Sequence, residues 1–213
     1  MISNNKFYSI LTLLLFMTVG IFGSQTDRLK KSEDDIFNLA NEKYEANSKK
    51  NEERDQKIKT ILATLIDYDA FAKNSLRGKD KKTKKTYWNS ITPEQQKEFS
   101  GLFKELIETS WMKELKKFNK NKKTIKKDEK YTVNYKDEKS KGTLTMVYTI
   151  IKSDDEITNV DFRFSGDKIT DFIIDDRSTV RRYRKSFSKH IRKNGFDHLI
   201  KKMKTKLEEV NKK

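Results

Sequence analysis

The chain has 213 residues, which is enough for one domain of ordinary size with a substantial core. Charged residues make up 38% of it, against about 25% in typical soluble domains, and the formal net charge is +16. This surplus of cations favours an anionic partner, such as a phosphate, a nucleic acid or lipid headgroups. The absence of cysteine excludes disulfides, thiolate metal sites and cysteine nucleophiles.

The first 24 residues differ from all that follow. Lys6 is their only charge, and residues 7–22 form one continuous apolar run. The run is followed by the small residues Gly23 and Ser24, and it is shorter than the roughly 20 residues of a spanning helix. We therefore expect a signal peptide at residues 1–24 and a single exported domain at 25–213. An uncleaved N-terminal anchor is the alternative.

Helical periodicity dominates the first half of the exported part. Apolar residues recur at intervals of three and four in the ranges 28–47, 51–66 and 67–76, which predicts three helices. A basic loop is expected to follow from Arg77 to Lys85.

The range 92–111 carries the strongest helix signal. Thr92 is a natural N-cap, Pro93 occupies the first helical position, and Gln95 completes a capping box. The lysine-rich residues 113–130 are expected to end this helix as a charged tether.

The apolar period then changes to two, which predicts strands. Four strands are expected, around residues 131–135, 144–150, 160–164 and 169–174. Their connections are short and polar, so we expect an antiparallel meander with one face toward the helices and one toward water. The expected apolar positions of the three central segments are Leu144, Met146, Tyr148, Ile150, Val160, Phe162, Phe164 and Phe172.

Two further helices complete the prediction. Asp175 or Asp176 is expected to cap the first, which would stop at Asn194 and Gly195, and Asp197 is expected to cap the second. The fold class is therefore α+β, a four-stranded antiparallel sheet packed on one face by several helices.

The sequence offers little for catalysis. His190 and His198 are the only histidines and neither lies in a recognisable motif, so both are interpreted as surface or packing residues. Asp175 and Asp176 could hold a cation, but helix capping is the preferred interpretation. We expect neither an enzyme nor a bound metal or cofactor, and an exported hydrolase is the least favoured class.

The range 181–193 holds seven cations and no acid, and it should form an outward-facing basic stripe on its helix. This stripe is either an ordinary solvated surface or a docking site for an anionic membrane, a lipid phosphate or an acidic protein. Nucleic-acid binding is not expected, because the aromatic residues fall on the apolar stripes rather than among the cations.

Three segments together resemble the MlaC family, also called the toluene-tolerance auxiliary family. The first runs from Ile61 to Ala72 and on to Leu76 and Gly78. The second includes Tyr87-Trp88, residues 92–99 and residues 103–106. The third begins at residues 171–174 and continues through Ser178, Val180, Tyr183-Arg184, Phe187, Ile191, Gly195 and Leu199-Ile200.

The resemblance extends from about residue 33 to residue 208, with two departures. Asp167 stands where the family often has tryptophan, and Asp176-Arg177 replaces a glycine before Ser178. The resemblance implies a periplasmic phospholipid carrier with an apolar cavity between sheet and helices. It also implies exchange of lipid with a ring-forming substrate-binding protein of an inner-membrane ABC transporter and with an outer-membrane lipoprotein complex.

On this basis the cavity walls are predicted to be apolar and the headgroup site cationic. Arg184 is the predicted headgroup ligand. The predicted wall residues are Leu62, Leu65, Phe71, Phe99, Phe103, Leu106, Met146, Tyr148, Phe162, Phe164, Phe172 and Tyr183. The alternative function is an exported basic domain with a solid core that binds anionic membrane surfaces or an acidic protein.

Overall fold

The computed structural model describes residues 24–42, 44–45, 48–121, 131–153 and 156–211. The expected leader, residues 1–24, lies outside this part except for Ser24, which caps the first described helix. None of the helices within the described ranges is long and apolar enough to cross a bilayer.

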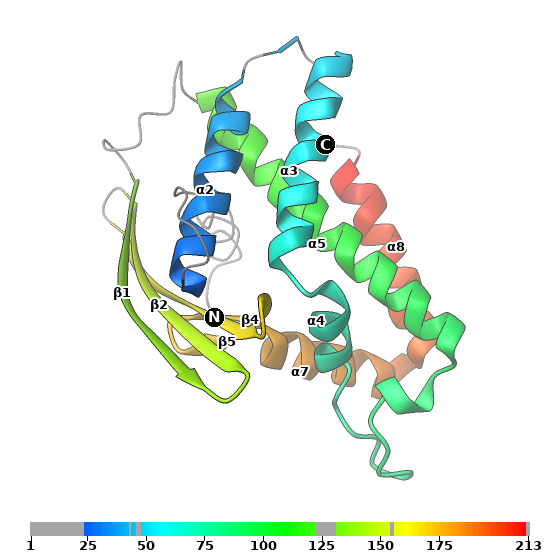
Figure 1. The fold of residues 1–213 in the computed structure, drawn as a ribbon. Coiled ribbons are helices and arrows are strands. Elements are labelled where there is room, and N and C mark those ends of the chain that lie inside the picture. Colours follow the sequence, from blue (N-terminus) through cyan, green and yellow to red (C-terminus); the bar gives the residue numbers. More distant parts are fainter. Residues whose placement is uncertain (1–23, 43, 46–47, 122–130, 154–155, 212–213) are drawn as a thin grey trace.

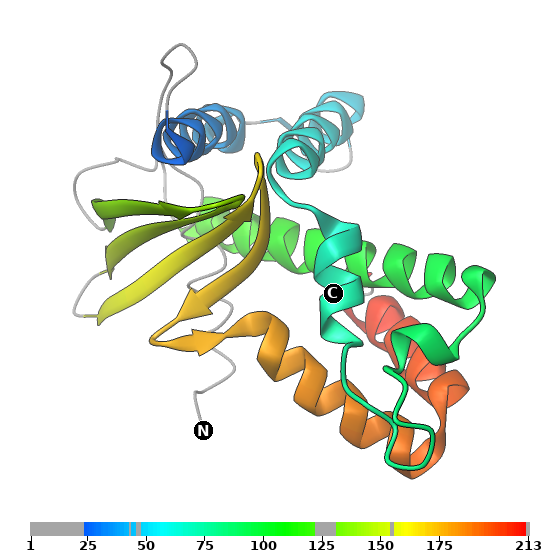
Figure 2. The same cartoon turned by 60° about the horizontal axis from the view of Figure 1, so that its bottom comes forward.

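The predicted α+β fold is confirmed. The described helices lie toward one face of the sheet, and the longest of them, α5, runs behind α2, α3 and α4 (Figure 1). Figure 2 shows α7 leaving the sheet from β5 and continuing below α4. The helices are α2 (Gln25–Asn41), α3 (Lys49–Leu65), α4 (Tyr68–Ser75), α5 (Pro93–Asn121), α7 (Thr179–Asn194) and α8 (Phe196–Asn211), with a short 3-10 turn, η1 (Trp88–Ser90).

The sheet contains the four expected strands as an antiparallel meander, and a short fifth strand extends it. The fifth strand was missed because its two residues were assigned to the start of a helix. In order across the sheet the strands are β1 (Tyr131–Lys141), β2 (Leu144–Ser153), β3 (Glu156–Ser165), β4 (Lys168–Ile174) and β5 (Arg177–Ser178).

The sequence had suggested that Asp175 or Asp176 caps α7. In the structure both residues form the turn between β4 and β5 instead. Both have positive φ angles, 46° and 63°, which tight hairpin turns of this kind require. Aspartate tolerates this conformation better than most residues, which explains how Asp176 can stand where the family often has glycine. Ser178 caps α7 instead, since its Oγ accepts a 3.0 Å hydrogen bond from the Arg181 amide.

The other helix ends follow the sequence more closely. Thr92 and Gln95 form the expected capping box, with hydrogen bonds of 3.1 and 3.3 Å. Gly195 ends α7 with a φ of 86°, also as expected. The last helix starts at Phe196, however, so Asp197 lies inside its first turn rather than at its cap.

Two helix lengths differ from the prediction. The first helix ends at Asn41 rather than at residue 47, and α5 continues to Asn121, ten residues beyond Trp111. Lysine has a high helix propensity, so the lysine-rich segment after Trp111 continues the helix instead of breaking it. The remainder of the expected tether, residues 122–130, lies outside the described residues.

The face of β2 that packs on the helices is the opposite of the expected one. The register pairs Val147 with Phe162, so these two residues share a face, and Met146 pairs with Arg163 on the other face. Val147 is fully buried, while Leu144, the first residue of the expected stripe, is 47% exposed. The expectation was wrong because the buried face of β2 alternates apolar residues with threonines, which looked polar. Thr149 can be buried because its hydroxyl donates to the Val160 carbonyl at 2.5 Å.

A buried carboxylate joins the sheet to α7. Asp171 of β4 accepts hydrogen bonds from the Ser178 hydroxyl at 2.6 Å and from the Val180 amide at 2.9 Å. It also pairs with Arg163 of β3 at 3.2 Å. A negative group at the first turn of a helix compensates its unpaired amides and its dipole, so Asp171 fixes where α7 leaves the sheet.

Candidate functional site

The region between the sheet and the helices is filled by most of the predicted wall residues. Eight of them are buried in one continuous core, each no more than 6% exposed: Leu62, Leu65, Phe71, Phe99, Phe103, Phe162, Phe164 and Phe172. Leu106 and Tyr183 are partly buried and pack against this core. We call this region the interlayer.

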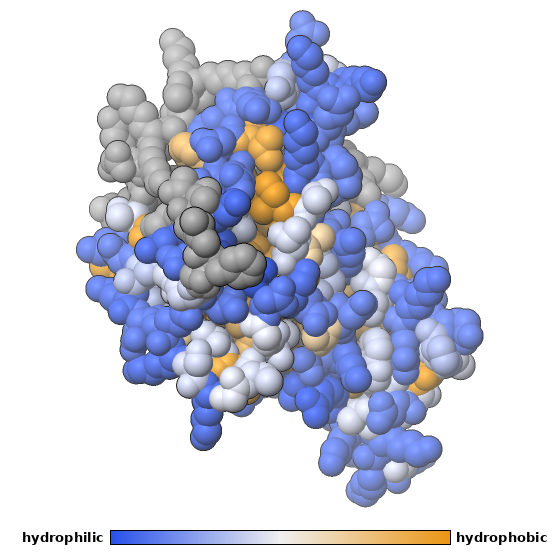
Figure 3. All heavy atoms as spheres, in the orientation of Figure 1, coloured by the Kyte–Doolittle hydropathy of each residue, from blue (hydrophilic) through white to orange (hydrophobic). Residues whose placement is uncertain are grey.

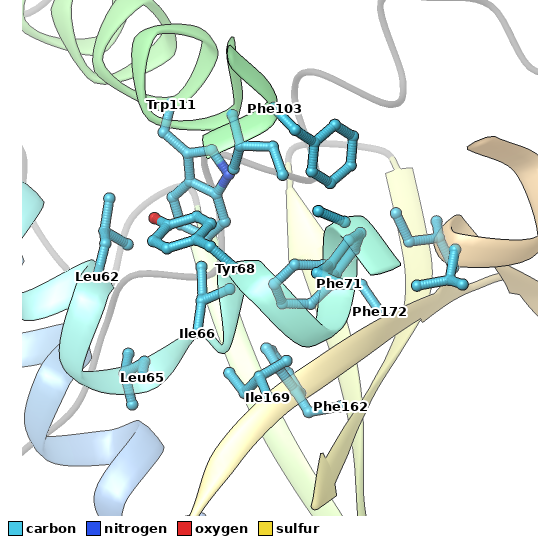
Figure 4. Close-up of a cluster of buried hydrophobic side chains, with 14 of the residues drawn as sticks. Leu62, Leu65, Ile66, Tyr68, Phe71, Phe103, Trp111, Phe162, Ile169 and Phe172 are labelled. Carbon is cyan, nitrogen blue, oxygen red and sulfur yellow. The ribbon is translucent and has the colours of Figure 1, made fainter. Parts of the chain in front are cut away.

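Aromatic rings cross the interlayer from the sheet to α7 (Figure 4 shows part of this cluster). The Phe172 ring of β4 lies 5.6 Å from Phe71 of α4, between ring centroids, and Phe71 lies 5.8 Å from Phe103 of α5. Phe103 then contacts Tyr183 and Phe187 of α7 at 5.1 and 5.9 Å. The rings pack against one another, so acyl chains could enter only if these side chains moved apart.

Met146 and Tyr148 are not brought together with the other predicted wall residues. They lie on the outer face of β2, opposite Arg163 and Asp161 of β3, and both are only partly buried. Lys139 of β1 lies over the Tyr148 ring, 5.5 Å from its centroid. Their placement follows from the reversed face of β2.

Arg184, the predicted headgroup ligand, lies at the junction of α7 and α4. Its Nε donates a 3.0 Å hydrogen bond to the Asn74 carbonyl near the end of α4. Burial and the neighbouring Arg77 and Arg181 lower the pKa of Arg184. Arg184 is not among the residues that line the two surface grooves described below.

One polar atom of the interlayer, Nε1 of Trp111 on α5, is buried without a hydrogen-bond partner among the described residues. The buried hydroxyl of Tyr68, at the start of α4, has the Glu108 carboxylate as its neighbour. Figure 4 shows the side chains of Trp111 and Tyr68 reaching into the apolar cluster. A buried donor without a partner costs about 1–3 kcal/mol, so most such groups in proteins are paired. Nε1 of Trp111 is therefore suited to a ligand that brings an acceptor into an otherwise apolar space.

Glu108 of α5 lies near the Tyr68 hydroxyl and affects its ionisation. Burial, the Glu108 charge and a hydrogen bond to the Glu108 carboxylate raise the pKa of Tyr68 far above its ordinary value, so the hydroxyl keeps its proton and remains a donor. Burial also raises the pKa of Glu108, against the opposing effect of Lys104, which lies 3.8 Å away.

A groove between the starts of α4 and α5 opens above Tyr68. Its volume is about 990 Å³, and Ile66 and Tyr68 contribute to its floor. Four lysines from three elements line it against two aspartates, and one of these, Asp67, is occupied in capping α4. The four are Lys73, Lys97, Lys104 and Lys168. An apolar floor with a cationic rim matches the chemistry of an amphiphile with an anionic head.

A second groove, of about 730 Å³, separates α2 from α3. Leu39 of α2 and Ile61 of α3 supply its apolar lining, and both pack against the core of the interlayer. In Figure 3 it appears as an apolar strip between two hydrophilic helices. The interlayer is thus flanked by two surface grooves, one with a cationic rim and the other with an apolar lining.

The described residues show no arrangement for metal binding. Within the described ranges, no three histidine, aspartate or glutamate side chains are grouped so that they could hold a metal ion. His190 is partly buried on α7, and its pKa is lowered by burial and by nearby cations, chiefly Lys202.

The lysines of the α4–α5 groove and the role of Tyr68 were not predicted from the sequence. These residues come from α4, α5 and β4, and no local motif connects them. Because 48 residues are lysine or arginine, the four groove lysines carry no signal of their own in the sequence.

The fold and site together define an α+β domain that can present an apolar interior and a cationic groove to an amphiphile. The family model of the MlaC protein matches residues 30–205. The chain belongs to the MlaC family, as the three sequence segments had indicated.

A search of curated proteins found no matching relative. Among solved structures, the fold is similar to that of a phospholipid-binding protein from Ralstonia solanacearum, solved in complex with a phospholipid. The TM-score is 0.65 and the identity 17%, over 89% of this chain and 99% of that one. At this identity the similarity concerns the fold.

Proposed function

We propose that the protein binds a phospholipid in the interlayer and carries it between membranes. The observation that carries the proposal is the partnerless buried donor of Trp111, next to Tyr68 and a lysine-lined groove. In this account the headgroup lies against the lysines, the donors meet ester or phosphate oxygens, and the acyl chains part the aromatic rings. Membership of the MlaC family and the fold of a phospholipid-binding protein support the proposal.

Energetics favour a carrier of this kind. Sheltering one methylene from water is worth about 0.8 kcal/mol, so a lipid with about 30 methylenes gains about 24 kcal/mol. That is beyond the usual ceiling for non-covalent affinity, and it makes free exchange through water too slow. Transfer from a bilayer into an apolar interior is nearly neutral by comparison, so a carrier can load and unload where it is docked.

The proposed setting is the periplasm, with the leader of residues 1–24 directing export. The proposed exchange partners are a substrate-binding ring protein of an inner-membrane ABC transporter and an outer-membrane lipoprotein complex. The protein itself catalyses no reaction in this account, and the transporter supplies the energy.

Removing a single hydroxyl tests the proposal. Tyr68→Phe should weaken retention of phospholipid loaded from vesicles about fivefold, because one hydrogen bond is worth about 1 kcal/mol. Tyr87→Phe is a matched control, since the Tyr87 hydroxyl is also buried but Tyr87 does not line the α4–α5 groove. Equal retention by wild type and Tyr68→Phe, with both variants folded, would contradict the assigned role of Tyr68. A wild-type chain that takes up no phospholipid would contradict the function itself.

A further inference from the structure

Two basic segments that are about 100 residues apart in sequence form one surface. The loop after α4 and the outer side of α7 lie next to each other at the lower end of the molecule (Figures 1 and 2). Across Arg77–Lys85 and α7 there is a single acidic residue, Asp80. We refer to the exposed cations of these two segments together as the basic face. They are Arg77, Lys79, Lys81, Lys82, Lys84, Lys85, Arg181, Arg182, Lys185, Lys189, Arg192 and Lys193.

The loop is held in place against α7. A Cβ built on Gly78 would fall 1.9 Å from the Ser188 hydroxyl, so the loop backbone lies directly on the helix. The Tyr87 amide donates to the Gly78 carbonyl at 2.8 Å, and the Asp80 amide donates to the Lys85 carbonyl at 2.9 Å. The lysines are therefore displayed on an ordered turn.

The one acid of the face is turned inward on its own loop. The Asp80 carboxylate accepts hydrogen bonds from the backbone amides of Lys82 and Thr83 at 2.9 and 2.8 Å. It therefore shapes the turn, and its single negative charge offsets little of the twelve cations of the face. Crowding of cations is visible at Arg184, where Arg77 and Arg181 add to burial in lowering the pKa.

The dimensions of the face fit an extended array of anions better than a single ligand. A helix of 16 residues, the length of α7, is about 24 Å long, which is far wider than one phosphate group. The exposed large apolar residues of the described chain, Tyr44, Leu144 and Ile157, lie elsewhere. Protein interfaces are depleted in lysine and rely on buried aromatic or apolar anchors, which this face lacks.

We propose that the basic face docks the protein on the surface of an anionic bilayer, without insertion. The loop of the face leads directly into Trp88, which lines the α4–α5 groove, and Lys73 of that groove precedes the loop. Docking through the face therefore brings the groove close to the bilayer. The inference goes beyond the proposed carrier function, because attachment to a surface is measured separately from uptake of a lipid.

The test is flotation of the full chain with vesicles of phosphatidylcholine, with or without roughly one part in three phosphatidylglycerol. Two variants each lose six exposed lysines by substitution with glutamine, so both lose the same net charge. The face variant changes Lys81, Lys82, Lys84, Lys85, Lys185 and Lys189. The control variant changes Lys31, Lys50, Lys57, Lys136, Lys141 and Lys152, which lie on other elements. Thermal unfolding verifies that both remain folded.

The expected result is binding that requires phosphatidylglycerol and that weakens when salt rises from about 0.1 M to about 0.5 M. The face variant should bind at least about tenfold more weakly than the control variant, since each lysine near the surface contributes. Equal losses in the two variants, or equal binding to both kinds of vesicle, would overturn the proposal. So would tighter binding to soluble polyglutamate than to anionic vesicles, which would assign the face to an acidic protein. If the face variant still takes up phospholipid but no longer floats with the vesicles, docking on the membrane and binding of a lipid are separate properties of the protein.

Discussion

The indole ring of Trp111 on α5 lies 6.3 Å from the ring of Phe172 on β4, measured between centroids. This contact closes the interlayer between the longest helix and the sheet, and the partnerless Nε1 of Trp111 lies in the same place. If acyl chains enter the interlayer, they must come into contact with Trp111. The fluorescence of this residue therefore reports directly on the proposed site.

Quenching by labelled lipid should distinguish the two tryptophans of the chain. In a Trp88→Phe variant, loading a phospholipid brominated on its acyl chains should strongly quench the remaining indole, Trp111. The matched variant is Trp111→Phe, in which Trp88 at the edge of the α4–α5 groove should be quenched less. The opposite order would place the chains in the groove and not in the interlayer.

The pH dependence of stability should depend on Glu108. Burial raises the pKa of Glu108 above its ordinary 4.5, so the folded protein binds this proton more tightly than the unfolded chain does. The resulting stabilisation is complete below about pH 4.5 and is lost as pH rises through the raised pKa. Glu108→Gln should therefore be more stable than wild type at pH 7, and the difference should shrink on acidification.

Denaturant unfolding between about pH 4 and pH 8 measures this difference. The control is Glu105→Gln, an exposed position on the same helix, for which the difference from wild type should change little with pH. A Glu108→Gln variant that is less stable than wild type at pH 7 would show that the pair with Lys104 outweighs the burial of Glu108.

Replacing Asp171 with asparagine should destabilise the fold by about 2–3 kcal/mol, because a hydrogen-bonded buried charge is lost. Its carboxylate accepts hydrogen bonds from the Ser178 hydroxyl and the Val180 amide at the start of α7. The NH₂ group of an asparagine can only donate, so it would face a second donor there. Asp161→Asn is the comparison, since burial and Asp176 raise the pKa of Asp161 and its charge is not favoured by the fold. Denaturant unfolding should show little loss for that variant, and similar losses for both would contradict the role given to Asp171.

Gly78→Ala should loosen the loop of the basic face, because the new methyl would overlap the Ser188 hydroxyl. Overpacking of this kind costs about 1–3 kcal/mol. Adding Ser188→Ala removes the overlapping oxygen, so the double variant should recover much of the stability. If the double variant loses as much stability as the two single variants together, the loop and the helix do not meet at this point.

How far the sequence predicts the fold depends on how the apolar residues are patterned. The helices of the first half have apolar stripes and caps, so residues such as Thr92 and Gln95 fix their starts correctly. In β2 both faces contain apolar side chains, and only the pairing of Val147 with Phe162 decides which is buried. Such register is a tertiary property that a single strand does not encode.

The candidate site could likewise be predicted from the sequence only in part. Apolar wall residues such as Phe71 and Phe172 are recognisable because large side chains on amphipathic elements tend to be buried. The groove lysines are not, since their proximity arises only when α4, α5 and β4 assemble. The partnerless state of Nε1 of Trp111 likewise depends on what surrounds it in the fold.

Native mass spectrometry of the purified chain, followed by organic extraction, tests the central claim most directly. The account predicts about one phospholipid per chain, retained through gel filtration and displaced when a second lipid is loaded from vesicles. A chain that is lipid-free after purification and cannot be loaded from vesicles would contradict it, and would leave a solid-core protein with a basic docking face.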